Sequence, residues 1–198
     1  MIALKEWAVV CKALEEGRQT ILLRKGGIME YREGFELKHD KFLLFPTFEH
    51  QSKDSIKQDY YEKFDELILE NNTAKEYVDL SLFGNVIDVK EIKDKDILKK
   101  LYTYHIWNER YVDFRMNYNP TKPMSVLFLR IYKIKEPVKV NIKKEWAGCK
   151  SWINMDGDIS STMINKSFKQ LHDENLLKPV VDDLTFNRLV NEINGVIK

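Results

Sequence analysis

Four segments carry the apolar patterns that are typical of β-strands. Residues 19–25 and 41–48 are short runs of branched and aromatic side chains that end at glycine or near proline. Residues 77–92 alternate apolar and polar positions around Gly84, which predicts one long strand with a bulge at that glycine. Residues 124–142 are the most strand-like stretch of the chain.

Helical spacing appears first near the N-terminus. Trp7, Val10, Cys11 and Leu14 recur at intervals of three and four residues, and Gly17 follows where a glycine commonly ends a helix. The pattern predicts a helix within residues 5–17.

Further helices are expected over 51–72, over 93–107 and in two short segments around Pro179. Residues 108–123 are aromatic and charged without a clear period, and we expect them to be irregular. Composition becomes more polar from Asp156 onward, which predicts a main domain over 1–155 and a helical C-terminal extension over 156–198.

Composition narrows the class of protein. The chain has 198 residues, of which 43% are hydrophobic and 32% are charged, and its formal net charge is +1. These values fit a globular protein, and no apolar run reaches the roughly 18 residues of a membrane helix. Two cysteines and an N-terminus without an export signal predict a reduced, cytoplasmic protein with no membrane partner.

Positive charge is concentrated locally. Residues 121–150 carry eight Lys or Arg side chains against two acidic ones, whereas the rest of the chain carries 24 basic and 29 acidic side chains. One interpretation is the solvated face of a half-buried strand, and the other is a surface that attracts anions. Both interpretations remain open at this stage.

The N-terminal segment resembles the opening of the ASCH domains, which belong to the PUA-like superfamily. The resemblance rests on Trp7, Gly17, Arg18, Thr20 and Arg24. Segments 39–47, 82–98 and 126–144 are similar to strands of the related EVE and YTH domains and follow in the same order.

A second resemblance covers the whole chain. The stretches LRKGGI (23–28), FLLFPTFEHQ (42–51), HIWNERYVDFR (105–115) and GCKSWI (148–153) are similar to a prokaryotic family of unknown function, DUF1802. Together the resemblances imply an α+β fold, a PUA-like bent β-barrel with flanking helices and a helical C-terminal extension. They also imply binding of RNA or of a modified base in DNA.

Some ASCH members are enzymes, and the sequence departs from one enzymatic pattern. The small ASCH amidohydrolases place a Lys directly before the motif's Thr and a second Thr two positions after it. Gln19 and Leu22 occupy those positions here, and neither side chain can activate water or form a covalent adduct. We do not expect that activity, and whether the protein is an enzyme at all stays open.

The candidate binding residues are cations, aromatic rings and a polar loop. Arg24 and Lys25 run into a Gly-Gly turn that could hold a phosphate, and His50 with Gln51 could contact a base edge. Trp107 and Trp152 are candidates for stacking on a base. Arg115, Arg130 and Lys133 could supply further positive charge.

Two alternatives remain. Asp88 and Lys90 have the D-x-K spacing of some metal-dependent nucleases, with Glu30 as a possible third group, but the spacing is common by chance. The same enzyme alternative includes a nucleotide-processing hydrolase. The other alternative is a protein-interaction module that uses the C-terminal helices. The histidines and cysteines have no metal-ligand spacing, so we expect no metal site and no cofactor. The expected partner is nucleic acid, and the oligomeric state is open.

Overall fold

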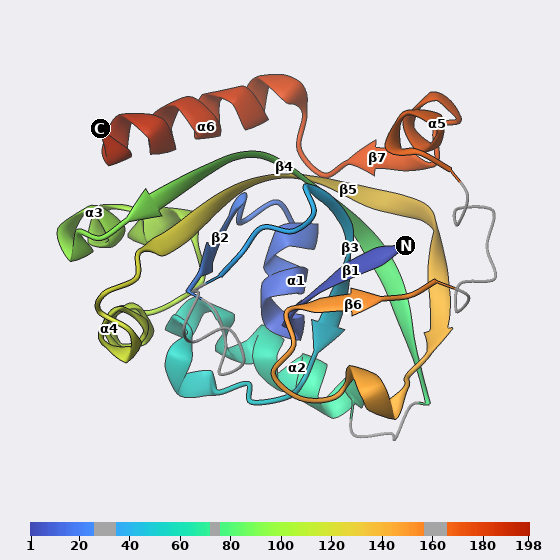
Figure 1. The fold of residues 1–198 in the computed structure, drawn as a ribbon, viewed down its shortest axis with the longest axis horizontal. Coiled ribbons are helices and arrows are strands. Elements are labelled where there is room, and N and C mark those ends of the chain that lie inside the picture. Colours follow the sequence, from blue (N-terminus) through green and yellow to red (C-terminus); the bar gives the residue numbers. More distant parts are fainter. Residues whose placement is uncertain (26–34, 72–75, 157–165) are drawn as a thin grey trace.

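The protein folds around one seven-stranded sheet that is strongly bent (Figure 1). The computed structural model describes residues 1–25, 35–71, 76–156 and 166–198. The strands are, in chain order, β1 (Ile2–Trp7), β2 (Ile21–Arg24), β3 (Lys41–Thr47), β4 (Tyr77–Ile92), β5 (Met124–Asn141), β6 (Trp152–Asn154) and β7 (Leu177–Pro179). The mixed α+β class expected from the sequence is confirmed.

The strand order is β2-β5-β4-β3-β1-β6, and β7 pairs with a second part of β5. β1 and β3 run parallel, whereas all other pairs are antiparallel. The long β4–β5 pair shifts register twice, at Leu80/Leu82 and at Val86/Asp88. The expected bulge at Gly84 is therefore wrong; Gly84 lies under Phe42, where an added Cβ would be 2.9 Å from the ring.

As far as the structure describes the chain, the bent sheet does not close into a barrel. Within the described residues, the two end strands β2 and β6 pair only with β5 and β1. Arg24 at the end of β2 spans the gap through side-chain hydrogen bonds to the Lys5 carbonyl and to Ser151, which precedes β6. We call this gap the open seam.

Helix α1 (Ala8–Glu15) lies inside the bend of the sheet, surrounded by strands (Figure 1). Six of its eight residues are buried, which explains why it is apolar on nearly all sides. The predicted helix began too early, because residues 2–7 pair with β3 and β6 as a strand. Its predicted end is confirmed: Gly17 has φ +70°, and a Cβ there would lie 2.8 Å from Val181.

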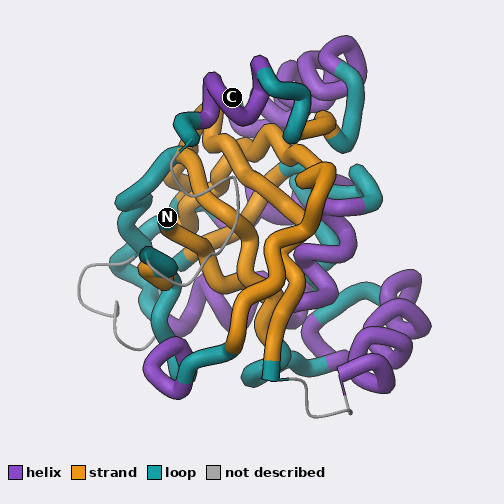
Figure 2. The backbone as a smooth tube through the Cα atoms, turned by 90° about the vertical axis from the view of Figure 1, so that its right-hand side faces the viewer, coloured by secondary structure: helices purple, strands orange, loops and turns teal. Residues whose placement is uncertain are grey.

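The remaining helices are α2 (Tyr61–Asn71), α3 (Lys95–Lys100), α4 (Glu109–Tyr118), α5 (Phe168–Asp173) and α6 (Asp183–Ile197). Figure 2 shows helical segments above the bent sheet and along its right-hand side. α4 corrects the expectation that 108–123 is irregular. Asn108 caps α4 by accepting a hydrogen bond from the Tyr111 amide at 2.9 Å. Val112 is the one buried residue of this helix, so its sequence carries no apolar stripe.

The C-terminal segment packs on the rest of the chain. β7 pairs with residues 132–134 of β5, and Leu171 and Leu177 belong to an apolar cluster on one face of the sheet. Ile193 of α6 belongs to the other cluster, which contains α1. The division into 1–155 and 156–198 stays a prediction.

Candidate functional site

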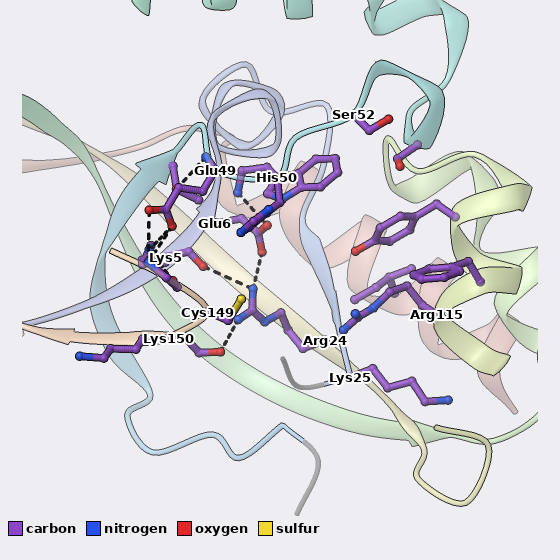
Figure 3. Close-up of a pocket in the computed structure, with 18 residues that line it drawn as sticks. Lys5, Glu6, Arg24, Lys25, Glu49, His50, Ser52, Arg115, Cys149 and Lys150 are labelled. Atoms are coloured by element: carbon purple, nitrogen blue, oxygen red, sulfur yellow. Dashed lines mark hydrogen bonds and ion pairs between the residues drawn. The ribbon is translucent and has the colours of Figure 1, made fainter. Parts of the chain in front are cut away.

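A pocket of about 370 Å³ opens at the seam (Figure 3). We call it the seam pocket. Its walls come from the ends of β1 and β2, from residues 47–55 after β3, from α4 and from residues 148–151. The parallel strands β1 and β3 end side by side at Trp7 and Thr47, so the segments that follow them reach the same place.

The pocket is positively charged. It is lined by five cations and two carboxylates, and each carboxylate already has a cationic partner within the protein. The cations are Lys5, Arg24, Lys25, Arg115 and Lys150, and the carboxylates are Glu6 and Glu49. An anionic ligand therefore meets a net positive surface.

Arg24 forms the floor of the pocket. Its guanidinium donates to Glu6 at 2.9 Å and to the Ser151 hydroxyl at 2.8 Å, and it lies 5.0 Å from the ring centre of Phe35. Glu6 is only 6% exposed and also accepts from the Trp7 amide at 2.9 Å. Arg24 thus stabilises the seam and also offers a fixed guanidinium to the pocket.

A second ion pair holds the opposite wall. Buried Lys5 donates to Glu49 at 2.8 Å and to the carbonyls of Trp146 and Gly148 at 2.8 and 2.9 Å. Burial alone would raise the pKa of Glu49. Hydrogen bonds from Lys5 and the Gly148 amide outweigh it, so the pKa is lowered and the carboxylate stays ionised.

Lys25, which follows β2, and Arg115 of α4 line the side of the pocket that α4 forms. Lys25 is buried and donates to the Met116 carbonyl at 2.9 Å. Burial, together with the nearby charge of Arg115, lowers the pKa of Lys25. Figure 3 shows the Arg24 and Arg115 side chains entering the pocket from different walls.

Aromatic side chains form the α4 wall. Tyr111 stacks on Trp107 with ring centres 3.9 Å apart and an interplanar angle of 13°, and Trp7 meets Trp107 edge-on. Trp107 is buried behind this wall and does not line the pocket. Phe114 does line it and is 63% exposed, so it is the ring that is placed to stack on a ligand.

His50 and Gln51 lie in the loop after β3. His50 lines the pocket, is exposed, and has φ +58°, which is uncommon for a residue other than glycine. Gln51 accepts a hydrogen bond from the Val9 amide at 3.3 Å and so caps the start of α1.

Three expected binding residues lie elsewhere. Trp152 packs beside Phe42 and donates to the Glu36 carbonyl, and it does not line the pocket. Arg130 pairs with Asp183 of α6, and Lys133 lies on β5 near Glu15. The basic excess of 121–150 is therefore divided among separate surfaces, and of the eight cations only Lys150 lines the seam pocket.

The residues of the nuclease alternative are not gathered at the pocket. Asp88 and Lys90 pair with each other at 2.8 Å on β4, and neither lines it. Glu30 lies outside the described residues. Among the residues that the structure does describe, no three His, Cys, Asp or Glu side chains are grouped so that they could hold a metal ion.

Several pocket residues were not among the candidate binding residues chosen from the sequence. They are Lys5, Glu6, Glu49, Tyr111, Phe114, Cys149, Lys150 and Ser151. A signal for most of them was present, because all four stretches that resemble the DUF1802 family contribute to this pocket. Residues 108–123 were predicted to be irregular. A helix at this place would have predicted that Tyr111, Phe114 and Arg115 share one face.

The family assignment follows from a family-model comparison. Residues 3–192 match the family described as domain of unknown function (DUF1802). The chain belongs to this family, as its sequence resemblance indicated. A search of curated proteins found no match.

Solved structures with some similarity include ASCH from Zymomonas mobilis, with 10% identity and a TM-score of 0.43 over 89% of this chain and 95% of that chain. A point mutant of the same protein has 11% identity and a TM-score of 0.45, with 89% and 98% covered. Within the described part of the chain, no helix is long and apolar enough to cross a membrane.

Proposed function

We propose that the protein binds a nucleic-acid strand, RNA or DNA with a modified base, in the seam pocket. The observation that carries the proposal is an excess of three positive charges, five cations against two carboxylates, beside one exposed aromatic ring. The volume of about 370 Å³ lies within the usual range of ligand sites.

The phosphate and the base of a nucleotide each find a counterpart in the pocket. Phosphate is bound in proteins through Lys and Arg, and Arg115 with Arg24 behind it supplies guanidinium groups. A base needs an apolar face on which to stack, and Phe114 presents one at the rim. Trp107 contributes indirectly, because it fixes Tyr111 in the wall that also carries Phe114.

Binding can be tested by fluorescence anisotropy with labelled single-stranded RNA, plain DNA and base-modified DNA at low salt. Phe114→Ala should weaken binding by about 1–3 kcal/mol without changing the salt dependence, since stacking releases no counterions. Leu69→Ala is the matched control, because Leu69 is exposed on α2 and does not line the pocket. Affinities no tighter than millimolar for every ligand would refute the proposal.

Hydrolysis of the bound nucleotide is a second candidate, and one observation favours it. His50 lines the pocket, as does Cys149, and its own backbone lies in the left-handed region. An imidazole can act as a general acid or a general base in hydrolysis. Product formation that is lost in His50→Ala while binding persists would establish this role, and no turnover by the natural protein would exclude it.

A further inference from the structure

A second cavity adjoins the seam pocket. It has a volume of about 490 Å³, and its lining runs from β3 to the segment that follows β5. We call it the lysine cavity, after Lys143 and Lys144 in its wall. The two cavities share Lys5, Thr47 and Glu49, so these residues form the ridge between them.

The ridge is held in place and carries little net charge. Lys5 and Glu49 neutralise each other at 2.8 Å, and both Glu49 oxygens lie 3.2 Å from the Gly148 amide. A free carboxylate here would repel a phosphate, but this one is matched by a buried ammonium. An anionic chain can therefore pass over the ridge.

The lysine cavity has the same two properties as the seam pocket. Lys144 is exposed and Lys143 is half-buried, and Lys150 of the same segment lines the seam pocket. Ile142 is 50% exposed and Phe48 is half-buried, so an apolar surface lies beside the lysines. Cations beside an apolar face again suit a phosphate and a base.

We propose that a bound strand occupies both cavities with successive nucleotides and crosses the ridge of Lys5 and Glu49. This inference rests on the proposed function and names its ligand class: a strand of at least two nucleotides rather than a single nucleotide. Contact with Lys143 and Lys144 adds to the phosphate contacts of the seam pocket.

Calorimetry with adenosine 5′-monophosphate and with 5′-phosphorylated adenosine dinucleotide and tetranucleotide tests the inference. The longer ligands should bind about tenfold more tightly than the mononucleotide, in keeping with one more stacked base. The double variant Lys143→Gln/Lys144→Gln should remove most of this gain and flatten the logarithmic salt slope by about 0.7 per lost phosphate contact. Its affinity for the mononucleotide should not change, which also shows that it is folded.

The double variant Lys135→Gln/Lys178→Gln is the control, because both lysines are exposed and line neither cavity. It should keep the full gain. Equal affinities for one and several nucleotides, a gain that survives loss of Lys143 and Lys144, or an equal loss in the control would overturn this inference and leave the proposed function standing. Failure of these ligands to bind would overturn this inference, and failure of the RNA, plain DNA and base-modified DNA strands as well would overturn the proposed function too.

Discussion

The seam pocket and the junction between β5 and α6 each contain an almost buried arginine, but the two guanidinium groups have different surroundings. Arg24 pairs with a buried carboxylate, Glu6, and faces a cavity lined by other cations. Arg130 pairs with Asp183, whose side chain is 90% exposed, and lies over the ring of Phe186. The first arrangement leaves cationic surface for a ligand, whereas the second joins two elements of the fold.

The comparison shows that basic residues have two different roles in this protein: some join elements of the fold, and others line a pocket. Residues 121–150 have the largest local excess of positive charge, but Arg130 is used to attach α6. The pocket instead takes its cations from β1, β2, α4 and the 148–151 segment. A charge count along the chain therefore cannot identify a binding surface when the cations that form it are distant in sequence.

The largest expected effect on stability comes from removing the C-terminal segment, and with it the junction between β5 and α6. A chain that ends at Met155 loses β7 and α6 and uncovers apolar residues of β5 such as Ile131 and Ile134. We expect the free energy of unfolding to fall by about 5 kcal/mol, which is comparable with the stability of a small domain. Urea unfolding followed by near-UV circular dichroism measures this loss.

A control for the same region is Leu184→Ser, since this residue of α6 is 83% exposed and its replacement should change stability by less than about 0.5 kcal/mol. Cooperative unfolding of the truncated chain at an unchanged urea midpoint would show that residues 156–198 are an independent extension.

Arg24→Met should have the next largest effect. It leaves Glu6 buried without its cation, and removing one member of a buried ion pair costs about 3 kcal/mol or more. Arg130→Met is the matched comparison. It should lower the free energy of unfolding by only about 1 kcal/mol, because the exposed Asp183 carboxylate stays in contact with water when its partner is removed. Equal losses in thermal or urea unfolding would contradict the distinction between the two sites.

A third buried polar side chain, His105, lacks even such a partner. Neither ring nitrogen forms a hydrogen bond within the described residues; the Trp107 backbone lies close enough to oppose the pKa shift slightly, but not in hydrogen-bonding geometry. Burial, followed by the charge of Lys57, lowers the pKa of His105 to about 3. The folded protein therefore keeps this imidazole neutral well below its usual titration range.

Acid should destabilise the protein through this residue. Above pH 6.5 the imidazole is neutral in both the folded and the unfolded chain. As the pH falls toward 3, only the unfolded chain takes up the proton, so the free energy of unfolding decreases by up to about 1.4 kcal/mol per pH unit. His105→Met should flatten the stability profile between pH 6.5 and 4, and an unchanged slope would show that other groups cause it.

The sequence predicted the long strands well because their apolar pattern is continuous. Residues 77–92 form β4 with the expected bounds. α4 was not predicted because most of its residues are exposed and its sequence shows no apolar period. Phe114, the ring that faces the pocket, was therefore not chosen as a candidate binding residue. The cationic site arises from tertiary proximity, since Lys5, Arg24 and Arg115 are brought together only by the pairing of β1 and the packing of α4.

The central claim is that a nucleic-acid strand meets the cations of the seam pocket rather than those of β5. The most direct test is the slope of logarithmic affinity against logarithmic salt concentration for a single-stranded ligand. Arg115→Gln should reduce this slope by about 0.7, the value for one phosphate contact, whereas Lys133→Gln on β5 should leave it unchanged. A slope that Arg115→Gln leaves intact and Lys133→Gln reduces would place the binding surface on β5 and contradict the account.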